Sequence, residues 1–314
     1  MIKYVLKRIG ISILTILVVM TITFFLMNAI PGSPFLTEKS TPQQIELANK
    51  KYGLDKPLIV QLGNYIKNYL SGDFGVSLKM QEGTPVRDII FSQGKFVLSL
   101  RLGLIALFLA ILIGMPLGCI ASYKRGTGWD GLLRVICTIG LAIPTFVLAG
   151  ELLIEFAVKK HIFPVNSGNL KNLGSYVLPV ISLSFYYLCS IFKRTRTSML
   201  DVINQDYIRT AVAKGVKTHK VIIKHALRNS LIPVVTYLGP VFAGIITGSL
   251  VIEQTFSIPG LGRYFVQSIL SRDYPIIMAT TVILATLVIF TNLIVDIAYK
   301  LIDPRITISS SEEI

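Results

Sequence analysis

Six long apolar runs constrain the fold of this chain more than any other feature of its sequence. A helix needs about 20 apolar residues to cross the hydrocarbon core of a bilayer. The 314 residues are 52% hydrophobic and only 15% charged, which is a composition suited to lipid. The runs are Ile9–Ile30, Phe96–Ser122, Leu132–Val158, Tyr176–Phe192, Leu231–Ile252 and Ile276–Tyr299. We therefore predict an all-α membrane protein with six transmembrane helices.

The first run has the basic head of a secretory signal peptide, because Lys3, Lys7 and Arg8 precede it. It is longer than the apolar region of a typical signal peptide, and Asn28-Ala29-Ile30 is a poor cleavage site. We expect residues 1–30 to be a short tail and an uncleaved first transmembrane helix.

Lysine and arginine are distributed unevenly between the two sides of the predicted membrane. Seventeen of them fall on the side that carries both termini, and five fall in the two short loops on the other side. Basic residues are retained on the cytoplasmic side of a membrane. We therefore expect a multi-pass protein with both termini in the cytoplasm. The net charge of +14 follows from this topology and indicates no nucleic-acid partner.

Two polar segments are too long to be simple connections. Residues 31–95 lie outside in this topology, and Thr41-Pro42-Gln43-Gln44 has the pattern of a helix start with Thr41 as N-cap. We expect an external helical segment between the first two spans. Residues 193–230 lie in the cytoplasm and are strongly basic. Residues 303–314 are expected to be a cytoplasmic tail, and its polar end, Ser309–Ile314, is expected to be disordered.

The basic segment has the pattern of two helices joined at a glycine. Apolar residues recur at helical spacing on both sides of Gly215, which permits the left-handed backbone that a sharp corner needs. One interpretation is that the segment is basic only because it lies in the cytoplasm and touches lipid headgroups. The other is that a helix pair held between two spans is a lever for a cytoplasmic partner.

A family resemblance favours the lever. Asp206–Ala211, Ala213-Lys214-Gly215, Lys224–Asn229 and Pro233 together resemble the cytoplasmic EAA loop of ABC importer permeases, in particular the dipeptide, oligopeptide and nickel branch. Arg209-Thr210-Ala211 stands where the general pattern has Glu-Ala-Ala. His225-Ala226-Leu227-Arg228 stands where it has Ile-x-Leu-Pro. Both departures fit the peptide branch.

The resemblance extends over nearly the whole chain. Tyr52–Pro57 and Ser71–Ser77 resemble the external segment of the B-type subunit of these systems. The loop before the last span also matches, and Asp303-Pro304-Arg305 resembles the family's ending. The matching positions of that loop include Glu253, Pro259, Gly260, Gly262 and Asp273. Pro31-Gly32-Ser33-Pro34 departs from the family, which commonly has aspartate at the third position.

The resemblance implies a type I ABC importer permease fold over residues 96–302, in a bacterial cytoplasmic membrane. It implies four kinds of partner: a second, C-type permease, two ABC ATPase subunits at the cytoplasmic face, an external peptide-binding protein, and a peptide substrate. The sequence has no G-x-x-x-x-G-K-[ST] loop to cradle phosphate. We therefore expect a pore-forming subunit that is not itself an enzyme, with no cofactor of its own and with ATP and Mg held by the ATPases.

In the family, a coupling helix within the EAA loop docks on the ATPase, and the resemblance places it at about Tyr207–Lys217. Ala211 and Gly215 are small enough to permit close approach, and Arg209 and Lys214 are candidates to pair with acids of the ATPase. The full set of expected coupling residues is Asp206, Tyr207, Arg209, Thr210, Ala211, Lys214, Gly215, His225 and Arg228.

Charged and polar residues within the apolar runs are candidates for the substrate path, because intramembrane polar groups are costly. Glu151 and Glu155 share a helix face, and Arg101 lies at a similar depth. Either Arg101 pairs with Glu151, or the carboxylates line a cavity and attract the amino terminus of a peptide. The fifth span is predicted to line the pore through Thr236, Tyr237, Thr247 and Ser249.

Small residues indicate close helix packing at Gly114-x-x-x-Gly118 and Gly244-x-x-x-Gly248. Packing within this subunit and packing against a second permease are both open. The three cysteines and three histidines are scattered without metal-ligand spacing, so we predict no metal site. Nickel is the alternative cargo within the family. A secondary transporter is a more distant alternative, and it would show inverted repeats or buried acid–base relays, which we do not find.

Overall fold

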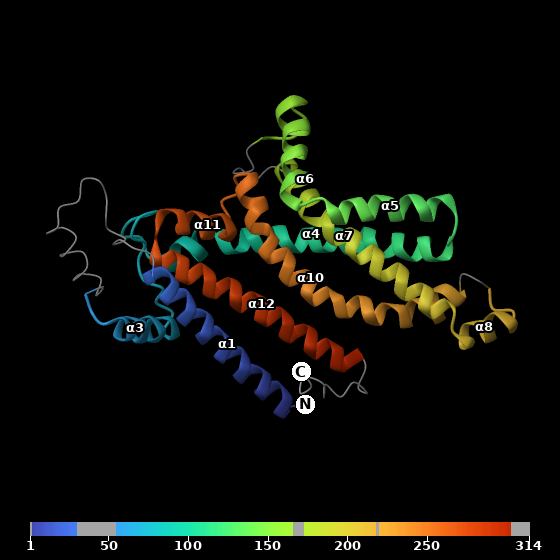
Figure 1. Ribbon diagram of the computed structural model, residues 1–314, viewed down its shortest axis with the longest axis horizontal. Coiled ribbons are helices and arrows are strands. Elements are labelled where there is room, and N and C mark those ends of the chain that lie inside the picture. Colours follow the sequence, from blue (N-terminus) through green and yellow to red (C-terminus); the bar gives the residue numbers. More distant parts are fainter. Residues whose placement is uncertain (1, 30–54, 166–172, 218–219, 303–314) are drawn as a thin grey trace. The chain divides into compact units, whose positions relative to one another are not determined.

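The computed structural model describes residues 2–29, 55–165, 173–217 and 220–302 (Figure 1). The regular elements in these ranges are helices, with one isolated bridge between Val76 and Pro85. The all-helical prediction is therefore confirmed for the part of the chain that is described. The predicted helix start at Thr41 lies outside it. The chain divides into two compact units, one from Met1–Leu100 and Ser257–Ile289 and the other from Arg101–Phe256 and Phe290–Ile314.

Four helices in the described ranges are long and apolar enough to cross a membrane. They are α1 (Ile2–Ala29), α4 (Lys95–Tyr123), α7 (Gly174–Ile203) and α12 (Tyr274–Ile302). A bent pair, α5 (Gly128–Ala142) with α6 and η2 (Thr145–Leu152 and Leu153–Lys159), is a fifth candidate. The predicted fifth span falls in α10 (Leu227–Thr255), which is one long helix but is not among these candidates.

The predicted third span is not one continuous helix. The pair bends by 100° between Ala142 and Thr145. Proline pushes the residue before it out of the helical region, and Ile143 accordingly has φ −77° and ψ 122°. Pro144 then takes the N-cap position of α6, where its missing N–H costs nothing. Pro144 falls within the predicted run Leu132–Val158, and the bend lies at this proline.

In the first unit, α3 (Leu58–Leu70) lies within the predicted external segment and covers α1 and α12. Its Leu62, Tyr65, Ile66 and Tyr69 pack against a buried cluster of apolar side chains. That cluster is formed by Met20, Phe24 and Met27 of α1 and by Tyr274, Ile277 and Met278 of α12. Because α3 buries one face only, it is amphipathic rather than apolar all round.

Asp273 clamps the turn at residues 77–80 to the start of α12. Its carboxylate is fully buried and accepts a hydrogen bond from Ser77 Oγ at 2.6 Å. The backbone N–H groups of Leu78, Lys79 and Met80 donate to it at 3.2, 3.0 and 2.9 Å. A buried carboxylate is costly unless its oxygens are satisfied, and these four donors satisfy it.

We predict that Asp273→Asn destabilises the first unit by about 2 kcal/mol or more. Both carboxylate oxygens of Asp273 accept hydrogen bonds, but the side-chain nitrogen of asparagine cannot accept one, so at least one donor loses its acceptor. Thermal unfolding of the detergent-solubilised protein measures the change. Asp55→Asn is the matched control, since Asp55 is exposed. Equal melting temperatures for the two variants would contradict the clamp.

The second unit is built around α7. A Cβ added at Gly118 of α4 would lie 2.7 Å from Thr195 Cβ, and one at Gly114 would lie 2.7 Å from the carbonyl oxygen of Leu188. Gly140 of α5 and Gly244 of α10 approach α7 as closely, at 2.7 Å from Cys189 and Tyr187 respectively. The Gly114-x-x-x-Gly118 pair therefore serves packing within this subunit. Gly244 does the same, and the surroundings of Gly248 lie outside the described side chains.

Candidate functional site

The predicted helix, glycine turn and second helix between the fourth and fifth runs are present. The first helix, α8 (Asp206–Ala213), follows α7 after a link of two residues, and Gln205 is its N-cap. Gly215 has φ +76°, and its N–H donates to Val212 O at 2.9 Å. This left-handed conformation is sterically unfavourable for residues with a Cβ, which is why the corner falls at a glycine. The chain then continues through η3 (Val221–Ala226) into α10.

One face of α8 is anchored to its own subunit. Ile208 and Ala211 are buried against Met199, Val221 and Ala226. The expectation that Ala211 permits close approach of a partner is therefore wrong, because three-residue spacing puts it on the same inner face as Ile208. Gly215 is exposed, and no atom lies within 4 Å of a Cβ placed there.

The other face of α8 is open. It carries Asp206, Arg209, Thr210 and Lys214, and all of these are exposed. Arg209 pairs with Asp206 at 3.7 Å, but both side chains are so exposed that the pair adds little stability. Tyr207 is 43% exposed, and its hydroxyl accepts from Asn229 Nδ2 at 2.8 Å.

Val212 also belongs to the open face, with 57% of its surface exposed, although the sequence did not single it out. The signal was its position one residue away from the buried Ala211 on a short amphipathic helix. His225 falls in η3 and Arg228 in the first turn of α10, and their side chains lie outside the described residues.

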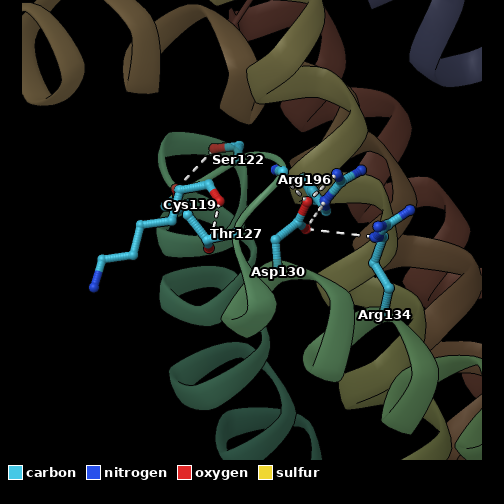
Figure 2. A network of polar contacts seen from close by, with 8 residues as sticks. Cys119, Ser122, Thr127, Asp130, Arg134 and Arg196 are labelled. Carbon is cyan, nitrogen blue, oxygen red and sulfur yellow. Dashed lines mark hydrogen bonds and ion pairs between the residues drawn. The ribbon is translucent and has the colours of Figure 1, made fainter.

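A buried ion pair joins α5 to the C-terminal part of α7 (Figure 2). Arg196 donates from Nε and NH2 to the two carboxylate oxygens of Asp130 at 2.7 and 2.8 Å. The N–H of Gly126 donates to the same carboxylate at 3.1 Å, and Arg134 Nε lies 3.6 Å away. Asp130 is 1% exposed. The bidentate geometry fixes both direction and distance between the two helices.

The sequence did not identify this pair. Arg196 counted only as one basic residue of the cytoplasmic segment, and Asp130 precedes the third apolar run. The available signal was a single acid in the first turn of a helix, followed four residues later by Arg134. Nothing in the sequence placed Arg196, 66 residues away, against it.

Among the predicted substrate-path residues of α10, the side chains of Tyr237 and Ser249 are described. Tyr237 is half-buried, and its hydroxyl lies 2.5 Å from Ser190 Oγ of α7. Ser249 is 2% exposed within the subunit, so the expectation that it lines an open path is wrong. The side chains of Thr236 and Thr247 lie outside the described residues.

The predicted pair between Arg101 and Glu151 does not form. Both side chains are exposed on their helices, and neither has an ion-pair partner among the described residues. Glu155 instead pairs with Lys159, one turn further along the same helix. The bend at Pro144 redirects α6, so similar depth in a straight-helix topology does not bring Arg101 and Glu151 together.

The residues of the predicted loop before the last span serve the fold. Gly260 is the N-cap of α11 (Leu261–Ser271), a helix that the sequence analysis did not anticipate, and Gly262 is buried in its first turn. The N–H of Leu261 donates to Ser99 Oγ at 2.8 Å. Pro259 is half-buried, and Asp273 forms the clamp described above. Glu253 is fully buried near the end of α10.

We predict that Asp130→Asn costs about 2 kcal/mol or more of folding free energy, because one N–H of the Arg196 fork then faces an amide nitrogen. Asp206→Asn is the control, since its pair with Arg209 is exposed. The melting temperature of the detergent-solubilised protein reports the difference. If Asp130→Asn and Asp206→Asn have the same melting temperature, the buried pair does not hold α5 to α7.

Comparison with known proteins places these features in a family. Residues 114–308 match the family model described as binding-protein-dependent transport system inner membrane component. Residues 1–101 match the N-terminal model of the same membrane component.

Relatives match over almost their full length. The chain is 43% identical over 307 residues to the dipeptide transport system permease protein DppB of Bacillus subtilis, covering 98% of each chain. It is 41% identical over 308 residues to the oligopeptide transport system permease proteins OppB of Haemophilus influenzae and Escherichia coli, covering 98% of this chain and 99% of theirs. The chain belongs to the family of membrane components of binding-protein-dependent transport systems.

Proposed function

We propose that this chain is the transmembrane permease subunit of an ABC importer that moves oligopeptides or dipeptides across the cytoplasmic membrane by alternating access. The observation that carries the proposal is the identity of 41% to 43%, over nearly the whole of each chain, to permeases named for oligopeptide and dipeptide transport. The resemblance of the EAA loop and the open face of α8 also support it.

The proposed topology has six spans, with both termini in the cytoplasm. The bent pair of α5 and α6 with η2 is the third span, and α10 is the fifth. Residues 31–95 are external in this topology. A second, C-type permease completes the pore, two ABC ATPases bind at the cytoplasmic face, and an external binding protein delivers the peptide. Six spans seldom enclose a hydrophilic path by themselves, which is why a partner permease is required.

The proposed coupling site is the open face of α8. Tyr207, Arg209, Thr210, Val212 and Lys214 would contact the ATPase, while Ile208 and Ala211 hold the helix to its own subunit. Closure of the ATPases on ATP would move α8. The link from α8 to α7 is only two residues long, so that motion would pass to α7 as a rigid-body displacement.

The energy source is separate from this chain in the proposal. The sequence has no phosphate-cradling glycine loop, so ATP and Mg belong to the partner ATPases.

We predict that Gly215→Val lowers peptide uptake at least tenfold while the complex still assembles. A β-branched side chain in the left-handed region costs at least about 1–2 kcal/mol, and relief of that strain would turn the open face of α8 away from its partner. Uptake by the reconstituted complex and co-purification of the ATPases are measured together. Gly215→Asn is the control, because asparagine tolerates this conformation, and it should stay near wild type. Normal uptake by Gly215→Val would contradict the coupling role.

We predict that Glu151→Gln reduces peptide uptake several-fold at a normal protein level, because an exposed intramembrane carboxylate would attract a peptide's amino terminus. Glu82→Gln, an exposed residue of the first unit, is the control. Unchanged uptake by Glu151→Gln, with equal protein in the membrane, would remove Glu151 from the path.

Affinity purification in mild detergent tests the proposed function as a whole. Recovery of a second permease, two ATPases and a binding protein is expected, followed by ATP-dependent uptake of labelled peptides by the purified assembly. Uptake of nickel in place of peptides would favour the nickel branch. Uptake that persists without ATP would favour a secondary transporter.

A further inference from the structure

The second unit contains a pocket of about 520 Å³ between α7 and α10. Its polar lining includes Tyr186, Ser190, Lys193, Arg194 and Asp201 of α7 and Tyr237 of α10. This volume lies within the range of small-molecule sites, which are usually lined by apolar groups with a few placed polar ones. Here more of the lining surface is apolar than polar, and the α7 wall supplies the charged groups that a charged ligand needs.

The polar residues form one stripe along a helix that is otherwise apolar enough to span a membrane. Tyr186, Ser190, Arg194, Thr197 and Asp201 recur every three or four residues and so share a face of α7. Polar side chains on a spanning helix face water or protein, because lipid cannot satisfy them. In the predicted topology, Tyr186 and Ser190 fall in the apolar run of α7, and Arg194, Thr197 and Asp201 fall in its cytoplasmic extension. The stripe therefore runs along one side of α7 from the span into the cytoplasm.

Arg194 is held within this stripe in a way that leaves its donors available. The guanidinium carbon lies over the ring of Tyr237, 4.1 Å from its centroid, which is a cation–π contact. The hydroxyl of that ring is fixed by Ser190 Oγ at 2.5 Å. Within the described part of the chain, the N–H edge of Arg194 has no hydrogen-bond partner.

The charges around the pocket favour an anion. Lys193 and Arg194 line it together, and Asp201 is the acid among its lining residues. Asp201 is seven positions from Arg194, which is about 10 Å along a helix. At that separation it does not neutralise the guanidinium by direct contact.

We propose that this pocket is a subsite for the C-terminal carboxylate of the transported peptide, bound by the N–H edge of Arg194 with Lys193 adding attraction. The inference rests on the proposed function, since it assumes that the cargo is a peptide. Arginine matches a carboxylate with two parallel hydrogen bonds, and the cation–π contact with Tyr237 holds the guanidinium at the pocket before the ligand arrives. A terminal carboxylate is common to peptides of any sequence, so one such group serves cargo of varied side chains.

The test is uptake of a peptide pair that differs only at this carboxylate. The complex with its ATPases and binding protein is reconstituted in liposomes, and trialanine is compared with trialanine amide. We expect Arg194→Gln to lower uptake of the free acid about tenfold, the equivalent of one charge-assisted hydrogen bond, with the amide unchanged within about twofold. Arg194→Lys should shift the ratio in the same direction but less, because it keeps the charge and loses the fork.

Two features keep the test decisive. The binding protein is the same in every sample, so its own preference cancels in the ratio of mutant to wild type. Arg125→Gln, an exposed arginine in the turn between α4 and α5, is the matched control and should leave both rates unchanged. Uptake rates are divided by the amount of assembled complex. If Arg194→Gln does not assemble, the mutant-to-wild-type ratio for the two peptides is measured with Arg194→Lys instead.

Three outcomes would overturn the subsite. One is an equal loss of both peptides in Arg194→Gln, and another is no loss of either. The third is a loss that appears only in liposomes containing anionic lipid, which would assign the pocket to a lipid phosphate. A wild-type complex that takes up neither peptide would instead count against the proposed function.

Discussion

Close approach of three helices to α7 is the constraint on which the second unit depends. In a membrane the hydrophobic effect does not drive helices together, so packing and polar contacts must do it. Glycines of α4, α5 and α10 provide that packing, because a Cβ at Gly118, Gly140 or Gly244 would lie 2.7 Å from an atom of α7. The sequence singled out Gly118 and Gly244 and left their use open, but it did not single out Gly140. The contacts show that they build this subunit.

The α7 helix connects α8, the Asp130–Arg196 ion pair and the pocket at Arg194. It is continuous from Gly174 to Ile203, so it extends past the apolar run into the polar region next to α8. Asp130 and Arg196 fix α5 to this extension. The pocket at Arg194 lies on the same stretch. A displacement of α8 would therefore reach the pocket through the two-residue link and the continuous helix α7.

The sequence predicted what is local. Apolar runs located the helices, and a glycine between two amphipathic patterns located the corner at Gly215. The sequence did not predict contacts between residues that are far apart along the chain. Ala211 was assigned to a partner because small residues suit interfaces, yet its face of α8 packs on Met199 and Val221. The Asp273 clamp joins residues 196 positions apart, and no local pattern announces it. Pro144 was visible in the sequence, but the size of the bend it allows depends on how α6 packs.

The central claim is that the outer face of α8 contacts an ATPase while its inner face holds the subunit together. A photo-crosslinking amino acid placed at Thr210 or at Ile208 in the assembled complex measures this directly. We expect position 210 to crosslink to an ATPase subunit and position 208 to crosslink only within this chain. An assembled, active complex in which position 210 gives no crosslink to an ATPase would contradict it.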